Sequence, residues 1–133
     1  MKSLDTNILI YAVSNAEGLK ENTAKLLLEE ALKGAWPIAA QVYGEFFSVM
    51  VRKKYMAQAE ARSTIQMYSE LMPALPSSVT AHTAALKLAA TKQMQYWDAL
   101  IVSICAENGV KKLYSEDLPG LVKPLGVQCI SPW

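Results

Sequence analysis

Four acidic side chains could do chemistry in this chain, because each lies within or beside a short apolar segment. They are Asp5, Glu45, Asp98 and Asp117. Carboxylates that a fold brings together repel one another and have raised pKa values unless a cation compensates for their charge. Oxygen ligands of this kind suit Mg²⁺ or Mn²⁺, and one or two such ions can activate water against a phosphodiester. The pattern predicts a divalent-cation site if the four acids converge.

Each acid, taken alone, also has a structural interpretation. Asp5 and Asp98 are placed where Asp often caps the N-terminus of a helix, and Asp117 suits a turn. Glu45 is surrounded by apolar residues on its predicted helix, where a solvated Glu is unusual, although the edge of an amphipathic stripe would also accommodate it. These alternatives stay open for each residue by itself. It is the recurrence of four acids in similar settings that favours a metal site.

Short apolar segments alternate with helical segments, a pattern typical of an α/β fold with a parallel sheet covered on both faces. The predicted strands are the opening stretch before Asp5 and residues 36–40, 73–76, 112–114 and 127–130. The predicted helices are residues 8–13, 21–33, 41–54, 57–71, 79–93 and 98–108. The carboxyl ends of all strands then share one edge of the sheet, where open α/β sheets bind ligands. We expect a single α/β domain, residues 1–133.

Composition limits the classes of protein to consider. With 52% hydrophobic and 19% charged residues the chain is globular and not disordered. The formal net charge of +1 argues against a strongly basic nucleic-acid binder, so a polyanion would be held by a local patch or by metal. We find no apolar run long enough for a membrane span and no export signal. Cys105 and Cys129 suit buried thiols of a reducing cytoplasm.

Other side chains have two interpretations each. Arg52 and Lys53 end a predicted helix, where cations suit the helix dipole, or they reach toward the phosphates of RNA. Tyr96 and Trp97 are interpreted as core residues, with stacking on RNA bases as the alternative. His82 is the single histidine and lies away from the four acids. With one His and no paired Cys, a Ser–His–Asp triad or a zinc site lacks its parts.

Four segments carry a family resemblance in their order and spacing. They are Asp5-Thr6-Asn7 followed by Ile-Leu-Ile-Tyr, Glu45 in a helix after a short strand, Trp97-Asp98-Ala99-Leu100-Ile101-Val102, and Leu113-Tyr114-Ser115-Glu116-Asp117. Together they resemble a PIN domain, and among PIN domains the VapC-like ribonuclease toxins of bacterial toxin–antitoxin pairs. The resemblance covers nearly the whole chain, including the tail of residues 126–133.

The resemblance implies a parallel sheet of strand order 3-2-1-4-5 and RNA cleavage that depends on one or two Mg²⁺ or Mn²⁺ ions. It also implies a small cognate antitoxin as partner, and a homodimer. Carried over by position, the metal-binding acids are Asp5, Glu45, Asp98 and Asp117. The supporting polar residues are Thr6, Asn7, Ser115 and Glu116. One departure is that many relatives have another acid or aromatic residue soon after the fourth acid, whereas residues 118–121 read Leu-Pro-Gly-Leu.

A second class of function stays open beside the nuclease. A PIN-like or receiver-like module could bind a metal ion without catalysis and act through a protein partner. A phospho-accepting receiver domain would require a second acid beside Asp5 and a Lys after the last strand. The sequence has neither, because Asp5 has no acidic neighbour and residues 127–133 contain no Lys. The metal-dependent endoribonuclease is therefore the favoured interpretation.

Overall fold

The structure is a computed structural model that describes residues 1–91, 94–118 and 123–133. The strands are β1 (Lys2–Leu4), β2 (Ile38–Ala39), β3 (Ala74–Leu75), β4 (Lys112–Tyr114) and β5 (Gln128–Ile130). The helices are α1 (Thr6–Val13), α2 (Leu19–Gly34), α3 (Ala40–Arg52), α4 (Gln58–Leu71), α5 (Val79–Ala90), α6 (Tyr96–Glu107) and the 3-10 helix η1 (Pro124–Gly126). Strands alternate with helices as the sequence predicts, and the α/β class is confirmed.

All strand pairs are parallel, but they form two sheets. One sheet has the order β1-β4-β5, and the other pairs β2 with β3. Neighbours within each sheet are those of the predicted order 3-2-1-4-5, whereas the ladder between β2 and β1 is missing. Pro37, just before β2, has no N–H to donate, and the Ser3 hydroxyl instead donates to the Pro37 carbonyl at 2.6 Å. A side chain thus replaces the backbone ladder at this junction.

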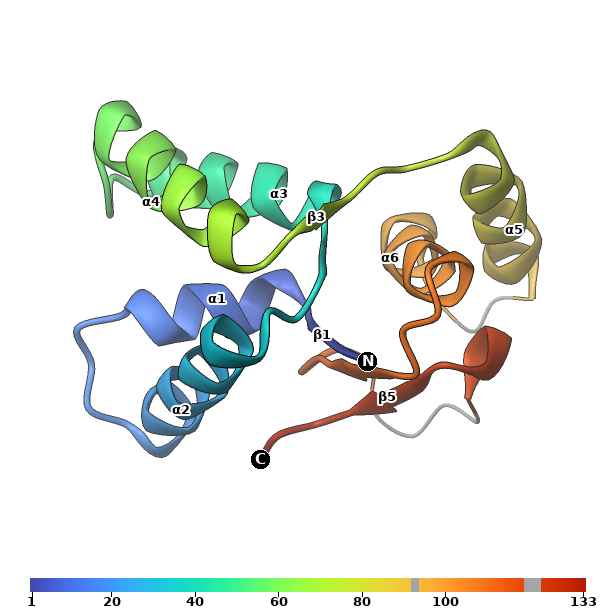
Figure 1. Cartoon of the computed structure of the whole chain (residues 1–133), viewed down its shortest axis with the longest axis horizontal. Coiled ribbons are helices and arrows are strands. Elements are labelled where there is room, and N and C mark those ends of the chain that lie inside the picture. Colours follow the sequence, from blue (N-terminus) through green and yellow to red (C-terminus); the bar gives the residue numbers. More distant parts are fainter. Residues whose placement is uncertain (92–93, 119–122) are drawn as a thin grey trace.

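Figure 1 shows how the helices surround the strands. The helices pack mainly against their neighbours in the chain, α1 with α2, α3 with α4, and α5 with α6. In this view α1 to α4 occupy the left half of the molecule, and α5 and α6 the right half. Because β1 runs directly into α1, and β2 directly into α3, the carboxyl ends of both strands carry the first turns of helices. Two of the four candidate acids lie at these junctions, Asp5 as the N-cap of α1 and Glu45 in the second turn of α3.

Helix α6 is the central helix of the core. Its residues 99–105 are all buried, including Ser103, whose hydroxyl donates to the Ala99 carbonyl at 2.7 Å. A helix that is apolar on every side belongs in an interior. The sequence placed the start of this helix at Asp98, but α6 begins at Tyr96 after the extended residue Gln95. Asp98 therefore lies within the first turn and is not the N-cap.

The remaining boundaries differ from the predicted ones by a few residues. Helix α5 ends at Ala90, earlier than the predicted end at residue 93, and residues 92–93 lie outside the described ranges. Both cysteines are free thiols, Cys105 fully buried and Cys129 partly so. Among the described helices, none combines the length and the apolar character that a membrane span requires.

Candidate active site

Asp5 lies at the end of β1 and caps α1. Its backbone N–H donates to the Tyr114 carbonyl at 2.9 Å, which holds it against the end of β4. Its Oδ1 accepts a hydrogen bond from the Thr6 N–H, and its Oδ2 accepts one from the Ser115 hydroxyl, both at 2.7 Å. The side chain is only 4% exposed. The N-cap interpretation is thus correct for Asp5, and the cap also brings the carboxylate to the junction of β1 and β4.

The electrostatic setting of Asp5 is that of a buried acid among other acids. Burial raises the pKa of Asp5 from its ordinary value of 3.8 to about 6, and the negative charges of Asp98 and Glu45 add to this rise. The hydrogen bonds from Ser115 and Thr6 oppose it only in part. A carboxyl group with this environment is stabilised as an anion when a cation is added nearby.

Glu45 is half-buried in the first two turns of α3. Its Oε2 accepts a hydrogen bond from the Thr6 hydroxyl at 3.2 Å, and its Oε1 accepts one from the Gln41 amide at 2.5 Å. The same Gln41 nitrogen lies 3.3 Å from the Trp97 carbonyl, so it joins α3 to the start of α6. Gln41 was missed in the sequence, although its position one turn before Glu45 places both on one helical face.

Asp98 and Asp117 line one cleft of about 510 Å³, together with Met94, Gln95 and Leu118. Burial raises the pKa of Asp98, and the charges of Asp117 and Glu45 raise it further. Asp98 accepts no hydrogen bond from any described residue.

Asp117 is exposed and is held by two contacts from its surroundings. The Asn7 amide donates to its Oδ2 at 3.0 Å, and its own backbone N–H donates to the Ser115 hydroxyl oxygen at 3.2 Å. Ser115 therefore contacts both Asp5 and the backbone of Asp117. One hydroxyl thus ties the acid after β1 to the acid after β4.

The four acids face one region but do not form a closed metal cage. Within the described residues, no three Asp, Glu, His or Cys side chains converge closely enough to make a ready cluster of ligands. Nor does a cation compensate for their charge there, since the ion pairs of the described residues are Lys20–Glu116 and Lys33–Glu29. These carboxylates raise one another's pKa because no positive charge lies among them. A divalent cation such as Mg²⁺, which binds oxygen ligands, would supply that charge.

The sequence also matches a model of a protein family, the PIN domain, over residues 3–118. The chain belongs to this family. The predicted family membership of this PIN domain is thereby confirmed. No curated protein matches the chain.

Solved structures share the fold of this PIN domain at low identity. A toxin–antitoxin complex from Klebsiella pneumoniae is 21% identical with a TM-score of 0.70, over 100% of this chain and 98% of that one. VapBC2 from Rickettsia felis, bound to a DNA fragment from its promoter, is 16% identical with a TM-score of 0.70, over 97% and 96%. Mycobacterium tuberculosis VapC20, a toxin that cleaves the sarcin–ricin loop, is 19% identical with a TM-score of 0.65, over 96% and 99%.

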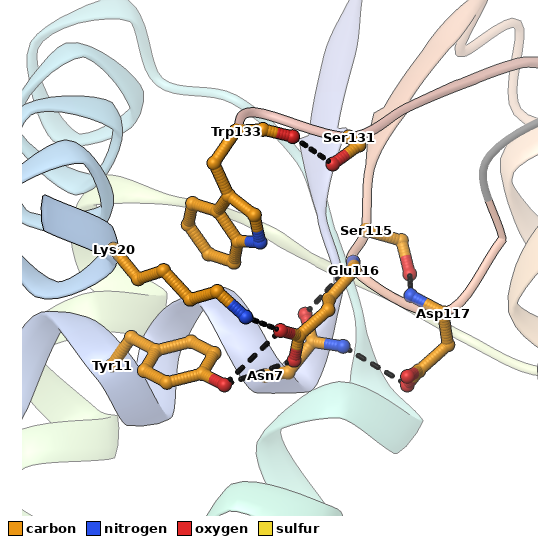
Figure 2. Close-up of polar contacts among 8 residues, drawn as sticks. All are labelled: Asn7, Tyr11, Lys20, Ser115, Glu116, Asp117, Ser131 and Trp133. Carbon is orange, nitrogen blue, oxygen red and sulfur yellow. Dashed lines mark hydrogen bonds and ion pairs between the residues drawn. The ribbon is translucent and has the colours of Figure 1, made fainter.

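Glu116 makes its contacts away from the four acids of this PIN domain. Its carboxylate accepts hydrogen bonds from Tyr11 and Lys20, as Figure 2 shows, and Lys20 lowers its pKa. Neither partner was given a role at the site from the sequence. The signal available for Tyr11 is that it follows Asn7 by four residues, so that both lie on one face of α1. The departure noted at residues 119–121 lies outside the described part of the chain.

The candidate RNA-contacting residues differ in whether they line a cleft. Arg52 and Lys53 are both exposed at the end of α3. Lys53 lines a cleft of about 570 Å³ that also includes Asn7 and Glu116, whereas Arg52 is not among its lining residues. Trp97 is 62% exposed, so its interpretation as a core residue is wrong. It borders a hollow with Glu45, and it lies in the first turn of α6, before the buried residues 99–105.

His82 takes part in a separate contact between α5 and α6. Its Nδ1 contacts the Tyr96 hydroxyl, and its Nε2 lies 2.9 Å from the Ser77 hydroxyl. The two rings are also stacked, with centroids 6.1 Å apart. His82 is exposed and therefore links α5 to the start of α6 on the surface.

Proposed function

We propose that this PIN domain is a Mg²⁺- or Mn²⁺-dependent endoribonuclease in which Asp5, Glu45, Asp98 and Asp117 hold one or two ions. The observation that carries the proposal is the electrostatic coupling of Asp98 to Asp5, Glu45 and Asp117 without a compensating cation among the described residues. Such a group of acids is costly to the fold unless a cation is bound. Acids that destabilise the fold in this way, and that lie at the carboxyl ends of parallel strands, are typical of a functional site.

In this proposal the four acids hold the ion, and neighbouring polar residues orient the acids. When bound, the ion supplies Lewis-acid chemistry, activating water for attack on phosphorus and stabilising the oxygen that leaves. Thr6 and Ser115 fix the Asp5 carboxylate, and Asn7 fixes that of Asp117. Gln41 and Thr6 fix Glu45 from two sides. Hydrogen bonds of this kind orient carboxylate ligands and tune their basicity.

The test of this proposal is cleavage of labelled transfer RNA and total RNA by the purified chain. Cutting is expected with Mn²⁺ or Mg²⁺ and is expected to stop with EDTA. Asp5→Ala, shown to be folded by circular dichroism, is expected to be inactive, which excludes a contaminating nuclease. Folded wild-type protein that binds Mn²⁺ but cuts no RNA would favour the non-catalytic module that acts through a protein partner.

We further propose that the nuclease is the toxin of a toxin–antitoxin pair and that it acts in the cytoplasm. We propose that it forms a homodimer in which each subunit is a single domain, residues 1–133. Support comes from the relatives of the same fold that were solved as toxin–antitoxin complexes. Light scattering on the purified chain is expected to give twice its 14.6 kDa mass. A cognate small protein from an adjacent reading frame is expected to suppress cleavage. A monomer at all concentrations, or cleavage unchanged by that protein, would contradict the assignment.

A further inference from the structure

Glu116 is held by groups that come from distant parts of the chain. Lys20 Nζ, on α2, lies 2.5 Å from its Oε1. The Tyr11 hydroxyl, on α1, is 3.0 Å from Oε2 and 3.2 Å from Oε1, so it contacts both oxygens of the carboxylate. Figure 2 shows both groups directed at Glu116. Two donors on two helices therefore fix one side chain that follows β4.

Trp133 completes this arrangement from the segment after β5. Its ring meets the Tyr11 ring edge to face, with centroids 5.2 Å apart and an angle of 87° between the planes. Lys20 Nζ lies 5.7 Å from the centroid of Tyr11 and 5.5 Å from that of Trp133, within the range of cation–π attraction. The ammonium group is thus restrained by two aromatic rings as well as by the carboxylate.

The backbone next to this side chain is tied to the candidate metal site. The Glu116 N–H donates to the side-chain Oδ1 of Asn7 at 3.4 Å, and the side-chain Nδ2 of Asn7 donates to Asp117 Oδ2 at 3.0 Å. Asn7 and Tyr11 are four residues apart on α1, so they present one face of that helix to residues 116 and 117. Fixing Glu116 therefore also fixes the peptide that leads into Asp117.

We propose that Tyr11, Lys20 and Trp133 form a clamp on Glu116, and that this clamp positions Asp117. Glu116 is in this account a positioning residue and not a ligand of the metal ion. The consequence for catalysis rests on the function proposed above, whereas the positioning itself is a property of the chain without metal or RNA.

The clamp differs from an ordinary surface ion pair, and α2 provides the comparison. Lys33 and Glu29 pair at 2.8 Å one helical turn apart, with side chains 75% and 59% exposed. Exposed pairs of that kind contribute little. The side chains of Lys20 and Glu116 are 47% and 27% exposed, and they join segments 96 residues apart in sequence. Lys33→Met is therefore a matched control for Lys20→Met, since both remove one ammonium group from α2.

The direct test is amide hydrogen exchange measured by NMR on metal-free protein. In Lys20→Met and in Trp133→Ala, exchange of the Glu116 and Asp117 N–H groups is expected to accelerate about fivefold. This is the change in local opening that corresponds to the loss of roughly one net hydrogen bond. In the same two variants, the Leu113 N–H in β4 is expected to exchange at the wild-type rate. In Lys33→Met, all amide groups are expected to exchange at their wild-type rates. Lys20→Arg and Trp133→Phe, which retain the charge or the ring, are expected to stay close to wild type.

Titration with Mn²⁺ then separates positioning from ligation. Lys20→Met and Glu116→Gln are each expected to weaken Mn²⁺ binding by about tenfold, as loss of an outer-shell partner does. The double variant is expected to be no weaker than either single one, because the two residues act through one contact.

Two results would overturn the clamp. One is unchanged exchange at residues 116 and 117 in both Lys20→Met and Trp133→Ala. The other is loss of Mn²⁺ binding in Glu116→Gln with normal binding in Lys20→Met, which would make Glu116 a ligand. Failure of the nuclease proposal is distinct, since exchange is measured without metal or substrate. A wild-type chain that cuts no RNA would overturn the proposed function and leave the exchange result standing.

Discussion

Replacing Asp98 by Asn is expected to lower the rate of RNA cleavage by at least about a hundredfold. Loss of a residue that only supports a metal ligand already costs up to about a hundredfold, and Asp98 is proposed to be a ligand itself. The same change is expected to leave the chain folded and slightly more stable without metal. The physical reason is that Asp98 is half-buried, accepts no hydrogen bond from the described residues and is repelled by Asp117 and Glu45. A neutral amide of the same shape removes this repulsion. The gain is expected to stay below about 1 kcal/mol because solvent screens the site.

Cleavage rates and thermal unfolding of the purified variant measure the two effects together. Glu107→Gln is the matched control, because Glu107 is the acid at the opposite end of α6 and contacts Ser78. It is expected to cut RNA at the wild-type rate. Wild-type cleavage by Asp98→Asn would show that Asp98 is not a ligand, and a clear loss of stability would show that its charge favours the fold.

Without divalent ions, the free energy of unfolding is expected to fall as the pH rises from about 4 to about 6. Asp5 is the cause, because its pKa is raised from 3.8 to about 6 in the folded chain. Between these values the folded state binds more protons than the unfolded state, so stability decreases with pH. A rise of this size corresponds to about 3 kcal/mol at most. Asp98 acts in the same direction, since its pKa is also raised.

Urea unfolding in EDTA at a series of pH values measures this dependence. The carboxyl groups of Glu116 and Glu29 have lowered pKa values and act with the opposite sign. The stability that they contribute is lost mainly as the pH falls below their ordinary pKa of 4.5, so their effect is confined to the lower end of the window. Asp5→Asn is expected to flatten the profile between pH 4 and 6, and Mn²⁺ is expected to restore stability at pH 7. A wild-type profile that rises through this window would contradict the assignment.

The fold was largely accessible from the sequence because apolar periodicity and the positions of Gly and Pro mark its elements. The start of α6 was not, because Gln95 begins that helix without a capping side chain that a sequence would reveal. At the break between β2 and β1, the Ser3 hydroxyl contacts the Pro37 carbonyl where a backbone ladder was expected. Neither feature has a local pattern from which it could be predicted.

At the candidate site, the sequence identified acids that the structure brings to one region, but it did not reveal how they are held. Gln41 lies on the same helix as Glu45, so helical spacing could have found it. Lys20 and Trp133 could not be found in this way, since their contacts with Glu116 and with Tyr11 join segments far apart in the chain. Such long-range pairing depends on the packing of α1 and α2 against the end of β4.

If the acids at the strand ends make one divalent-cation site, anomalous scattering from a crystal soaked in Mn²⁺ will locate the ion. We expect a Mn²⁺ peak in contact with the carboxylates of Asp5 and Asp98, and no such peak in a crystal of Asp98→Asn. A peak elsewhere, or none at a Mn²⁺ concentration that supports RNA cleavage, would contradict the proposed site.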